Sequence, residues 1–278
     1  MERRRIELLG WPLGYSVSPA FQNAGFAALG LDIVYTARPV APPDLAVAVQ
    51  DLRQPDCLGA NVTVPHKEAV LALVDQLTSQ ARRAGAVNTV VNQAGRLLGH
   101  NTDLGGFGRA LEDLGVLLPL SRVLLLGAGG AARAAALVLL DGGAEVAVYN
   151  RTPQRAMALL ASLGRGRVVD ATQATHLAQA GQVDLVVNTT SAGLDNLSHP
   201  LPGLRVTPDT LCYDMIYNPP LTPFLRDAQA QGARTAAGLS MLVYQGAESF
   251  SLWTRLPAPL EVMMDAARAG LTALGSRR

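Results

Sequence analysis

The first hundred residues alternate between short apolar runs and segments whose apolar residues recur every three or four positions. The short runs have the length of strands, and the longer segments have the period of helices. This alternation predicts a mostly parallel sheet covered by helices. The expected strands are residues 6–10, 34–36, 59–64, 87–91 and 96–99, the last two as a hairpin, and the expected helices are residues 20–29, 44–52 and 67–77.

The same pattern restarts at Val123. Strands are expected at residues 122–126, 145–149, 167–169, 184–188 and 211–214, with helices at 104–114, 131–141 and 153–163. After Gly238 the chain is helical again, ending in a helix over residues 259–274. We therefore predict an α/β protein of two domains. Residues 1–103, completed by 239–278, form the first, and residues 104–238 form a Rossmann-like doubly wound second domain.

Composition narrows the class of protein. Of 278 residues, 49% are hydrophobic and 16% are charged, and the net charge is +1, which excludes a basic footprint for nucleic acid or an anionic membrane. No apolar run approaches the ~20 residues of a membrane span. Cys57 and Cys212 match no metal spacing and indicate a reducing compartment. We expect a cytoplasmic monomer or homodimer without a metal, its histidines serving structural or surface roles (His66, His100, His176 and His199).

A glycine-rich loop follows the strand at 122–126. It runs Gly127-Ala128-Gly129-Gly130-Ala131-Ala132, which is G-x-G-x-x-A opening a helix. The first glycine permits a tight turn, the second lets the backbone approach a pyrophosphate, and the alanine allows close helix–strand packing. The exposed N–H groups and the helix dipole favour phosphate binding. The strand and helix context favours a dinucleotide site over a mere tight turn.

The end of the next strand indicates which dinucleotide binds. An NAD-binding domain usually places an acidic residue there for the ribose hydroxyls. This chain has Asn150, Arg151 and Thr152, with Arg155 one turn later. Guanidinium groups suit a 2′-phosphate, which an acid would repel. We therefore predict NADP rather than NAD, with solvated arginines at a helix start as the alternative.

Lys67 is the one lysine among 23 basic side chains. Arginine stays protonated, whereas the ammonium of lysine can give up its proton. A reaction that needs a proton donor near neutral pH would keep lysine at one position and reject arginine. The alternative is that this lysine survived by drift on a solvated helix face. Its place in Asn61-Val-Thr63-Val-Pro-His-Lys67, at the end of a predicted strand, favours function.

Other polar side chains gather at the ends of predicted elements. Asn61 and Thr63 share one strand face, and polar residues at a strand's carboxyl end suggest ligand contact. Ser16 and Ser18 supply two hydroxyls in a loop, although Ser18 alone is a good candidate for a helix N-cap. Asn88 and Asp103 also stand at the ends of predicted elements, and Asp103 is alternatively an N-cap of the helix that follows.

In combination, these motifs resemble the shikimate dehydrogenase family over nearly the whole chain. Nine motifs in order are far more specific than any one of them. They are residues 16–19 (S-V-S-P), 61–67 (N-V-T-V-P-H-K), 85–89 (G-A-V-N-T), 101–103 (N-T-D), 127–131 (G-A-G-G-A), 150–152 (N-R-T), 188–193 (N-T-T-S-A-G), 213–217 (Y-D-M-I-Y) and 238–245 (G-L-S-M-L-V-Y-Q). One departure is Tyr15, where many members have histidine.

The resemblance implies roles for individual residues. Lys67 and Asp103 match the catalytic pair. The implied substrate-binding residues are Ser16, Ser18, Asn61, Thr63, Asn88, Tyr217 and Gln245. The implied cofactor-binding residues are Gly127, Ala128, Gly129, Gly130, Ala131, Asn150, Arg151, Thr152, Arg155, Thr190, Met215, Gly238 and Met241.

The implied reaction is the reversible NADPH-dependent reduction of 3-dehydroshikimate to shikimate, in the biosynthesis of chorismate and the aromatic amino acids. Lys67 would stabilise and protonate the oxygen of the reduced ketone, and Asp103 would orient Lys67. Two alternatives remain: a relative acting on quinate or another cyclic hydroxy acid, and a non-catalytic NADP(H)-binding sensor. A sensor would need neither Lys67 nor Asp103, so their presence together argues against it.

Overall fold

The structure is a computed structural model that describes residues 3–14 and 16–275, so Tyr15 lies outside the described residues. The chain divides into two compact units. The first comprises residues 1–106 and 242–278, and the second comprises residues 107–241. Each unit contains one six-stranded sheet. Their boundaries fall inside two helices, α4 (Asp103–Asp113) and α9 (Leu239–Thr254).

The sheet of the first unit has the order β2-β1-β3-β5-β6-β4. Its strands are β1 (Arg4–Gly10), β2 (Ile33–Pro39), β3 (Cys57–Val62), β4 (Gln76–Leu77), β5 (Thr89–Gln93) and β6 (Arg96–His100). β1 pairs in parallel with β2 and β3, and β4 with β6. β5 pairs antiparallel with both β3 and β6, which confirms the predicted hairpin.

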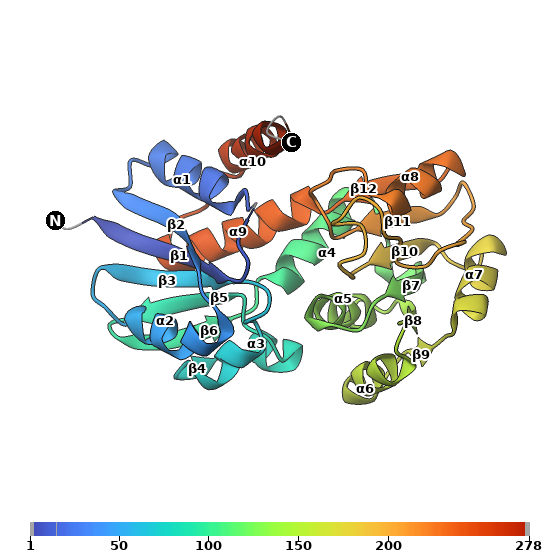
Figure 1. The fold of residues 1–278 in the computed structure, drawn as a ribbon, viewed down its shortest axis with the longest axis horizontal. Helices are drawn as coiled ribbons and strands as arrows, with labels where there is room; N and C mark the ends of the chain where they lie inside the picture. Colours follow the sequence, from blue (N-terminus) through green and yellow to red (C-terminus); the bar gives the residue numbers. More distant parts are fainter. Residues whose placement is uncertain (1–2, 15, 276–278) are drawn as a thin grey trace. The chain divides into compact units, whose positions relative to one another are not determined.

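Helices cover both faces of this sheet (Figure 1). On one face, α2 (Leu45–Asp51), the 3₁₀ turn at Ala69–Ala72 and α3 (Ser79–Ala84) pack on a core that includes Leu9 and Val62. A further 3₁₀ turn, Pro42–Asp44, precedes α2.

The other face carries α1 (Ser18–Ala28), α9 and α10 (Leu260–Gly275). The rings of Phe26 and Phe250 stack at 4.8 Å, and the indole of Trp253 donates to the carbonyl of Val90 at 2.9 Å. Residues of α9 and α10 from Leu242 on therefore belong to the first unit.

The sheet of the second unit has the order β12-β11-β10-β7-β8-β9, and every pair in it is parallel. Its strands are β7 (Arg122–Leu126), β8 (Glu145–Tyr149), β9 (Arg167–Val168), β10 (Leu185–Asn188), β11 (Leu211–Asp214) and β12 (Arg234–Ala237). The chain leaves the central β7 first toward β8 and β9 and then returns to β10 on its other side. This reversal is the doubly wound arrangement that the sequence predicted.

Helices also lie on both sides of the second sheet (Figure 1). They are α5 (Gly130–Asp141), α6 (Pro153–Leu163), α7 (Ala171–Gln179) and α8 (Pro223–Ala230), with a 3₁₀ turn at Leu118–Leu120. Residues of α7 and α8 share a buried core with Leu124 and Leu126 of β7.

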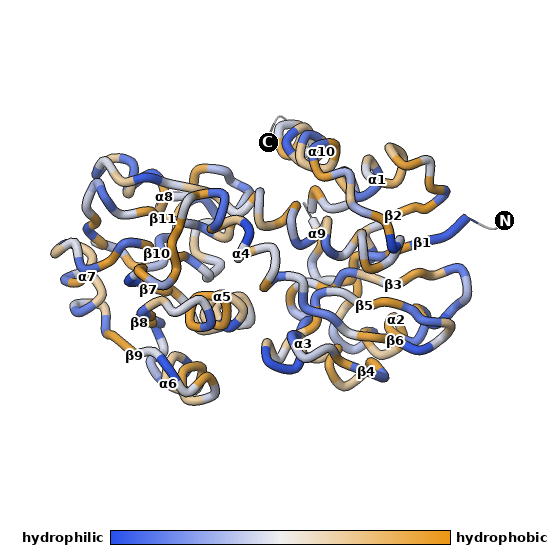
Figure 2. Tube along the Cα trace, turned by 180° about the vertical axis from the view of Figure 1, so that it is seen from behind, coloured by the Kyte–Doolittle hydropathy of each residue, from blue (hydrophilic) through white to orange (hydrophobic). Residues whose placement is uncertain are grey.

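Several strands, such as β3 and β5 of the first sheet, are coloured as hydrophobic in Figure 2, as expected for strands buried on both faces.

One predicted element is wrong. Residues 67–77 do not form a helix: a turn at Lys67 leads into the short 3₁₀ helix, and Gln76–Leu77 pairs with β6 as β4. The Asp75 carboxylate accepts the backbone N–H of Leu97 at 2.7 Å and fixes this edge pairing. Tertiary pairing therefore overrides a helical apolar pattern. Lys67 consequently lies in a turn and not at the start of a helix.

Other differences concern the ends of elements. The N-cap of α1 is Val17, and Ser18 is the first residue of the helix, so Ser18 is not the cap. The third strand ends at Val62 rather than residue 64. The sequence patterns also did not reveal α3, α7, α8 or β12.

Candidate active site

The ammonium of Lys67 and the carboxylate of Asp103 form an ion pair in the first unit, with Nζ 2.7 Å from Oδ2. The side chains are 26% and 11% exposed, so the pair is partly shielded from water while Lys67 stays accessible. Lys67 lies in the turn after β3, where its carbonyl accepts the N–H of Val87 at 2.8 Å. Asp103 begins α4 just after β6, and its N–H donates to Asn101 at 3.1 Å.

Asn88 fixes the other oxygen of Asp103. Its amide nitrogen donates to Oδ1 of Asp103 at 2.9 Å and to Oε1 of Gln245 at 3.1 Å. Its own oxygen accepts the backbone N–H of Thr102 at 2.7 Å. Asn88 is 2% exposed. Because both ends of its amide are held, the orientation of Asp103 and Gln245 is set by the fold.

Asn61 lies on strand β3, which pairs with β5 in the sheet. Its oxygen accepts the hydroxyl of Tyr35 at 2.8 Å, and its nitrogen donates to the hydroxyls of Thr89 at 3.0 Å and Ser249 at 3.1 Å. All its polar atoms thus have protein partners. This geometry favours a supporting role, and direct contact of Asn61 with a substrate stays a prediction.

The loop after β1 lies beside the end of β3. The N–H of Trp11 donates to the carbonyl of Val64 at 3.0 Å, and that of Thr63 donates to Leu9 at 2.8 Å. Farther along this loop, the Ser16 hydroxyl accepts the N–H of Ser18 at 3.2 Å. Ser16 therefore helps to start α1, a structural role that the sequence did not suggest.

Sequence reasoning missed several polar residues of this network. Thr102 lies within the 101–103 motif but was given no role, and its hydroxyl donates to Gln245 at 3.3 Å. Ser249 follows Gln245 by one helical turn, and its hydroxyl donates to the Gln245 carbonyl at 2.9 Å. The four-residue spacing, which places Gln245 and Ser249 on one helix face, was the signal from which Ser249 could have been found. Thr89 and Tyr35, which bond Asn61, are also part of this network.

The candidate cofactor positions of the second unit follow the carboxyl ends of five parallel strands. Gly127 to Ala131 follow β7, Asn150 to Arg155 follow β8, Thr190 follows β10, Met215 follows β11, and Gly238 and Met241 follow β12. In a doubly wound sheet this edge, at the reversal of strand order, is where ligands bind. Tyr217 also lies in this unit, two residues after Met215.

The glycine loop has the form that a pyrophosphate requires. Gly127 has φ +116°, which an L side chain rarely adopts, and a Cβ there would strike Thr189. A Cβ on Gly129 would meet nothing within 4 Å, so the space over this glycine is open. Gly129 is the N-cap of the twelve-residue α5, whose first N–H groups receive no side-chain cap. The residues present therefore fit a bound diphosphate.

The loop after β8 carries two arginines without acidic partners among the described residues. Arg151 and Arg155 are exposed, and Asn150 shapes the loop by donating to the Thr152 carbonyl at 2.8 Å. No carboxylate stands where a dehydrogenase for NAD would place one. This chemistry fits the 2′-phosphate of NADP.

Buried polar residues hold the remaining candidate cofactor loops. The amide of Asn188 donates to Asp214 at 3.0 Å, and its oxygen accepts the N–H of Thr190 at 3.0 Å. Burial raises the pKa of Asp214, whose other oxygen accepts the Thr222 hydroxyl at 2.7 Å. Gly238 packs against the backbone of Met215, where a side chain would not fit.

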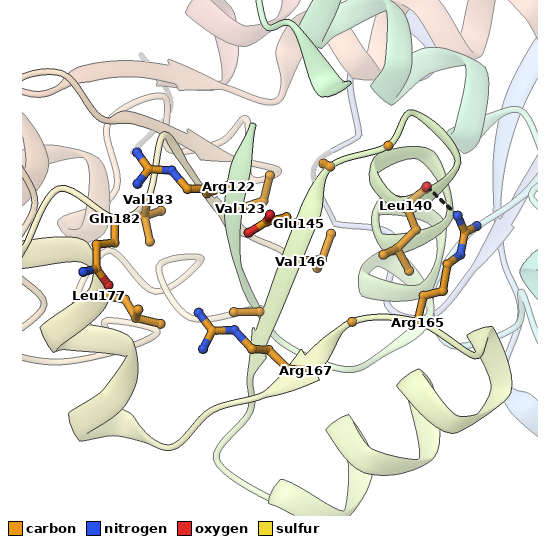
Figure 3. A pocket seen from close by; sticks show the side chains of 14 residues that line it. Arg122, Val123, Leu140, Glu145, Val146, Arg165, Arg167, Leu177, Gln182 and Val183 are labelled. Atoms are coloured by element: carbon orange, nitrogen blue, oxygen red, sulfur yellow. Dashed lines mark hydrogen bonds between the residues drawn. The ribbon is translucent and has the colours of Figure 1, made fainter. Parts of the chain in front are cut away.

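A cavity of about 650 Å³ lies at the amino ends of β7 and β8 (Figure 3). Arg122 at its rim is paired with Asp184 at 2.6 Å, and Arg165 donates to the Leu140 carbonyl at 2.9 Å. Because Gly127 follows the opposite end of β7, this cavity is no part of the candidate cofactor site.

Within residues 3–14 and 16–275, no three histidine, cysteine or acidic side chains are grouped to hold a metal. His66 is buried and bonds the Val40 carbonyl at 2.7 Å, a structural role. Across the same described part of the chain, no helix has the length and apolar character needed to cross a membrane.

Family models match three parts of the chain: the shikimate dehydrogenase substrate binding domain at residues 8–90, shikimate / quinate 5-dehydrogenase at 112–198, and the shikimate 5′-dehydrogenase C-terminal domain at 238–268. Shikimate dehydrogenase (NADP(+)) of Moorella thermoacetica is 44% identical, covering 96% of this chain and 94% of the relative. That of Desulfitobacterium hafniense is 42% identical, covering 95% and 97%.

A solved structure agrees with these matches. Shikimate 5-dehydrogenase of Thermus thermophilus, in complex with NADP(H) and shikimate, superimposes with a TM-score of 0.89 at 41% identity. The match covers 96% of this chain and 100% of that one. The chain belongs to the shikimate dehydrogenase family.

Proposed function

We propose that this protein is an NADP-dependent shikimate dehydrogenase, which reduces 3-dehydroshikimate to shikimate and catalyses the reverse oxidation. The observation that carries this proposal is the Lys67–Asp103 pair, partly shielded and held by Asn88 within the polar network of the first unit. A binding sensor would need no such proton-transferring pair. The relatives at 42% and 44% identity, named for the same activity, support the proposal.

The chemistry divides between cofactor and protein. When bound, NADPH supplies the hydride for the ketone carbon. The ketone oxygen then gains negative charge, which the Lys67 ammonium stabilises before donating its proton. Asp103 holds Nζ in place and accepts a hydrogen bond from the resulting hydroxyl. In the oxidation Lys67 accepts that proton, a role that arginine cannot fill.

The first unit supplies the other contacts with the substrate. We assign the carboxylate to Ser16 and Ser18 and the ring hydroxyls to Thr63, Asn88 and Gln245. Tyr217 is assigned to the substrate carboxylate from sequence alone. Residues 1–103 with 239–278 would thus bind the substrate, and residues 104–238 would bind NADP.

The second unit supplies the cofactor contacts. The loop from Gly127 to Ala131 would bind the pyrophosphate, and Arg151 and Arg155, with Asn150 and Thr152, the 2′-phosphate. We assign Thr190, Met215, Gly238 and Met241 to the ribose and nicotinamide. A cytoplasmic location and a monomer or homodimer stay predictions; the cysteines Cys57 and Cys212, free and buried, suit a reducing compartment.

Initial rates of four reactions test the proposal: shikimate or quinate, each with NADP or NAD. We expect fastest turnover with shikimate and NADP. Faster turnover of quinate would assign the chain to the quinate-using members of its family, and NADP binding without turnover of either acid would favour the sensor.

A further inference from the structure

Asn188 and Asp214 form a buried polar pair at the carboxyl ends of two neighbouring strands. Asn188 is the last residue of β10 and Asp214 is the last of β11, and the two lie opposite each other in the parallel register. Both residues are 0% exposed. The amide nitrogen of Asn188 donates to Oδ1 of Asp214 at 3.0 Å. A buried carboxyl group is costly unless hydrogen bonds compensate for its lost water, so its partners show what the pair holds.

The side chain of Asn188 holds the loop after β10. Its amide oxygen accepts the backbone N–H of Thr190 at 3.0 Å and the Thr190 hydroxyl at 2.8 Å. Its amide nitrogen also donates to the carbonyl of Ala192 at 3.1 Å, and the N–H of Ala192 donates to the Thr190 hydroxyl at 3.1 Å. These bonds fix both the backbone and the side chain of Thr190.

Asp214 holds the loop after β11. Its Oδ1 accepts the N–H of Ile216 at 3.0 Å. The backbone carbonyl of Asn188 accepts the N–H of Met215 at 3.0 Å, which ties the loop to β10 as well. The carbonyl of Ile216 in turn accepts the N–H of Gly238 at 3.1 Å, just after β12. One buried pair therefore links the loops that follow three strands.

The linked loops all belong to one end of the candidate cofactor site. They are the loops assigned above to the ribose and nicotinamide. The glycine loop has a hydrogen bond of its own, from the N–H of Gly127 to the Tyr149 carbonyl at 2.8 Å. The arginine-bearing loop after β8 is shaped by Asn150, which donates to the Thr152 carbonyl at 2.8 Å. The buried pair thus bears on the nicotinamide end more than on the adenosine end.

We propose that Asn188 and Asp214 are positioning residues that hold the nicotinamide end of the NADP site in one conformation. This role rests on the proposed function, since it concerns the cofactor of that reaction. Neither side chain needs to touch NADP, because each acts through the backbone of the loop beside it. Loops arranged before the ligand arrives lose less conformational freedom on binding, which raises affinity. Breaking the pair should therefore weaken contacts with the nicotinamide half and spare those with the adenosine half.

Isothermal titration calorimetry with two ligands tests this selectivity. NADP has both halves, whereas 2′,5′-ADP has the adenosine half alone. In Asn188→Ala the Thr190 N–H loses its acceptor and Asp214 loses a donor, so we expect the Kd for NADP to rise by roughly tenfold or more. The Kd for 2′,5′-ADP should stay at the wild-type value. Asp214→Asn, which keeps the size of the side chain, should show the same selectivity and carries the test if Asn188→Ala does not fold.

Asp184→Asn is the matched control. Asp184 lies just before β10, at the amino end of the same sheet, and pairs with Arg122, so both Kd values should stay unchanged. Partial unfolding of a variant would lower the amount of ligand bound per protein without changing the ratio of the two Kd values. Equal weakening of NADP and 2′,5′-ADP binding, or an unchanged Kd for NADP in both variants, would overturn the positioning role. A wild type that binds NADP but does not oxidise shikimate would overturn the proposed function alone, since these Kd values need no turnover.

Discussion

Nζ of Lys67 and Oδ2 of Asp103 lie 2.7 Å apart, although the two residues are 36 positions apart along the chain. One residue follows a strand that ends at Val62, and the other begins a helix just after β6. Asn88 holds the second oxygen of Asp103 and so fixes the direction from which the carboxylate meets the ammonium. The geometry of the pair therefore depends on elements of the first unit that are far apart in sequence.

Replacing Asp103 by Asn tests this relationship. The amide keeps the size of the side chain and loses the charge that holds Nζ, so Lys67 should be misplaced and proton transfer slowed. We expect kcat for shikimate oxidation to fall by roughly 10²-fold or more, with a smaller change in KM. Asp265→Asn, an exposed change on α10, serves as the control. A kcat equal to that of wild type would refute the orienting role.

Asn88→Ala should lower both activity and stability. The change removes the amide that binds Asp103 and Gln245, and it leaves the buried Thr102 N–H without its acceptor. An unsatisfied buried group costs about 1–3 kcal/mol of unfolding free energy. Urea unfolding followed by circular dichroism measures the cost. If the unfolding midpoint did not move, Asn88 would not hold the network together.

Cofactor preference should depend on the arginines after β8. In the double variant Arg151→Ala with Arg155→Ala, the 2′-phosphate loses its charged donors, worth about 1.5–3 kcal/mol each. We expect the Kd for NADP to rise by at least about tenfold while the Kd for NAD changes little. Arg167→Ala, at the amino end of the same sheet, is the control. Equal weakening of both cofactors would indicate general damage to the domain instead.

The fold explains why much of it could be predicted. The parallel strands are buried on both faces, so β7, β8, β10 and β11 read as apolar runs bounded by glycine and polar residues. The loop from Gly127 could be recognised in the sequence because a strand, glycines and a helix follow one another in a fixed order. Local chemistry therefore sufficed for most strands of the second sheet and for the turn of the glycine loop, although β12 was not predicted.

The edge of the first sheet could not be predicted in this way. Residues 67–77 have a helical apolar pattern, but Gln76–Leu77 pairs with β6, a partner distant in sequence. The roles of Thr102 and Ser249 likewise depend on α9 packing against β5 and α4, which no local pattern encodes. Sequence suggested the chemistry at Lys67 and Asp103, and the surrounding network became visible only in three dimensions.

The stability of the protein should depend on pH through Glu248. Burial first, and the charge of Asp103 second, raise its pKa from 4.5 to about 7 in the folded chain, so the folded state binds the proton more tightly. The stabilising contribution of Glu248 should therefore be fullest below pH 4.5 and be lost as pH rises through 7. After allowance for its partial exposure, this contribution is about 1–2 kcal/mol.

Thermal unfolding in steps between about pH 5 and 8 measures that contribution. The loss of stability over this range should be smaller in Glu248→Gln than in wild type, because the variant has no proton to release there. Parallel curves for the two proteins would show that Glu248 does not titrate in this range.

Lys67→Arg tests the central claim most directly. The substitution keeps the positive charge beside Asp103 and removes the group able to exchange a proton near neutral pH. The rate of NADPH formation from shikimate and NADP, measured in wild type and variant, should fall by roughly 10²–10⁴-fold while the Kd for NADP stays the same. A variant that turns over shikimate at nearly the wild-type rate would contradict the assignment of Lys67 as the proton donor.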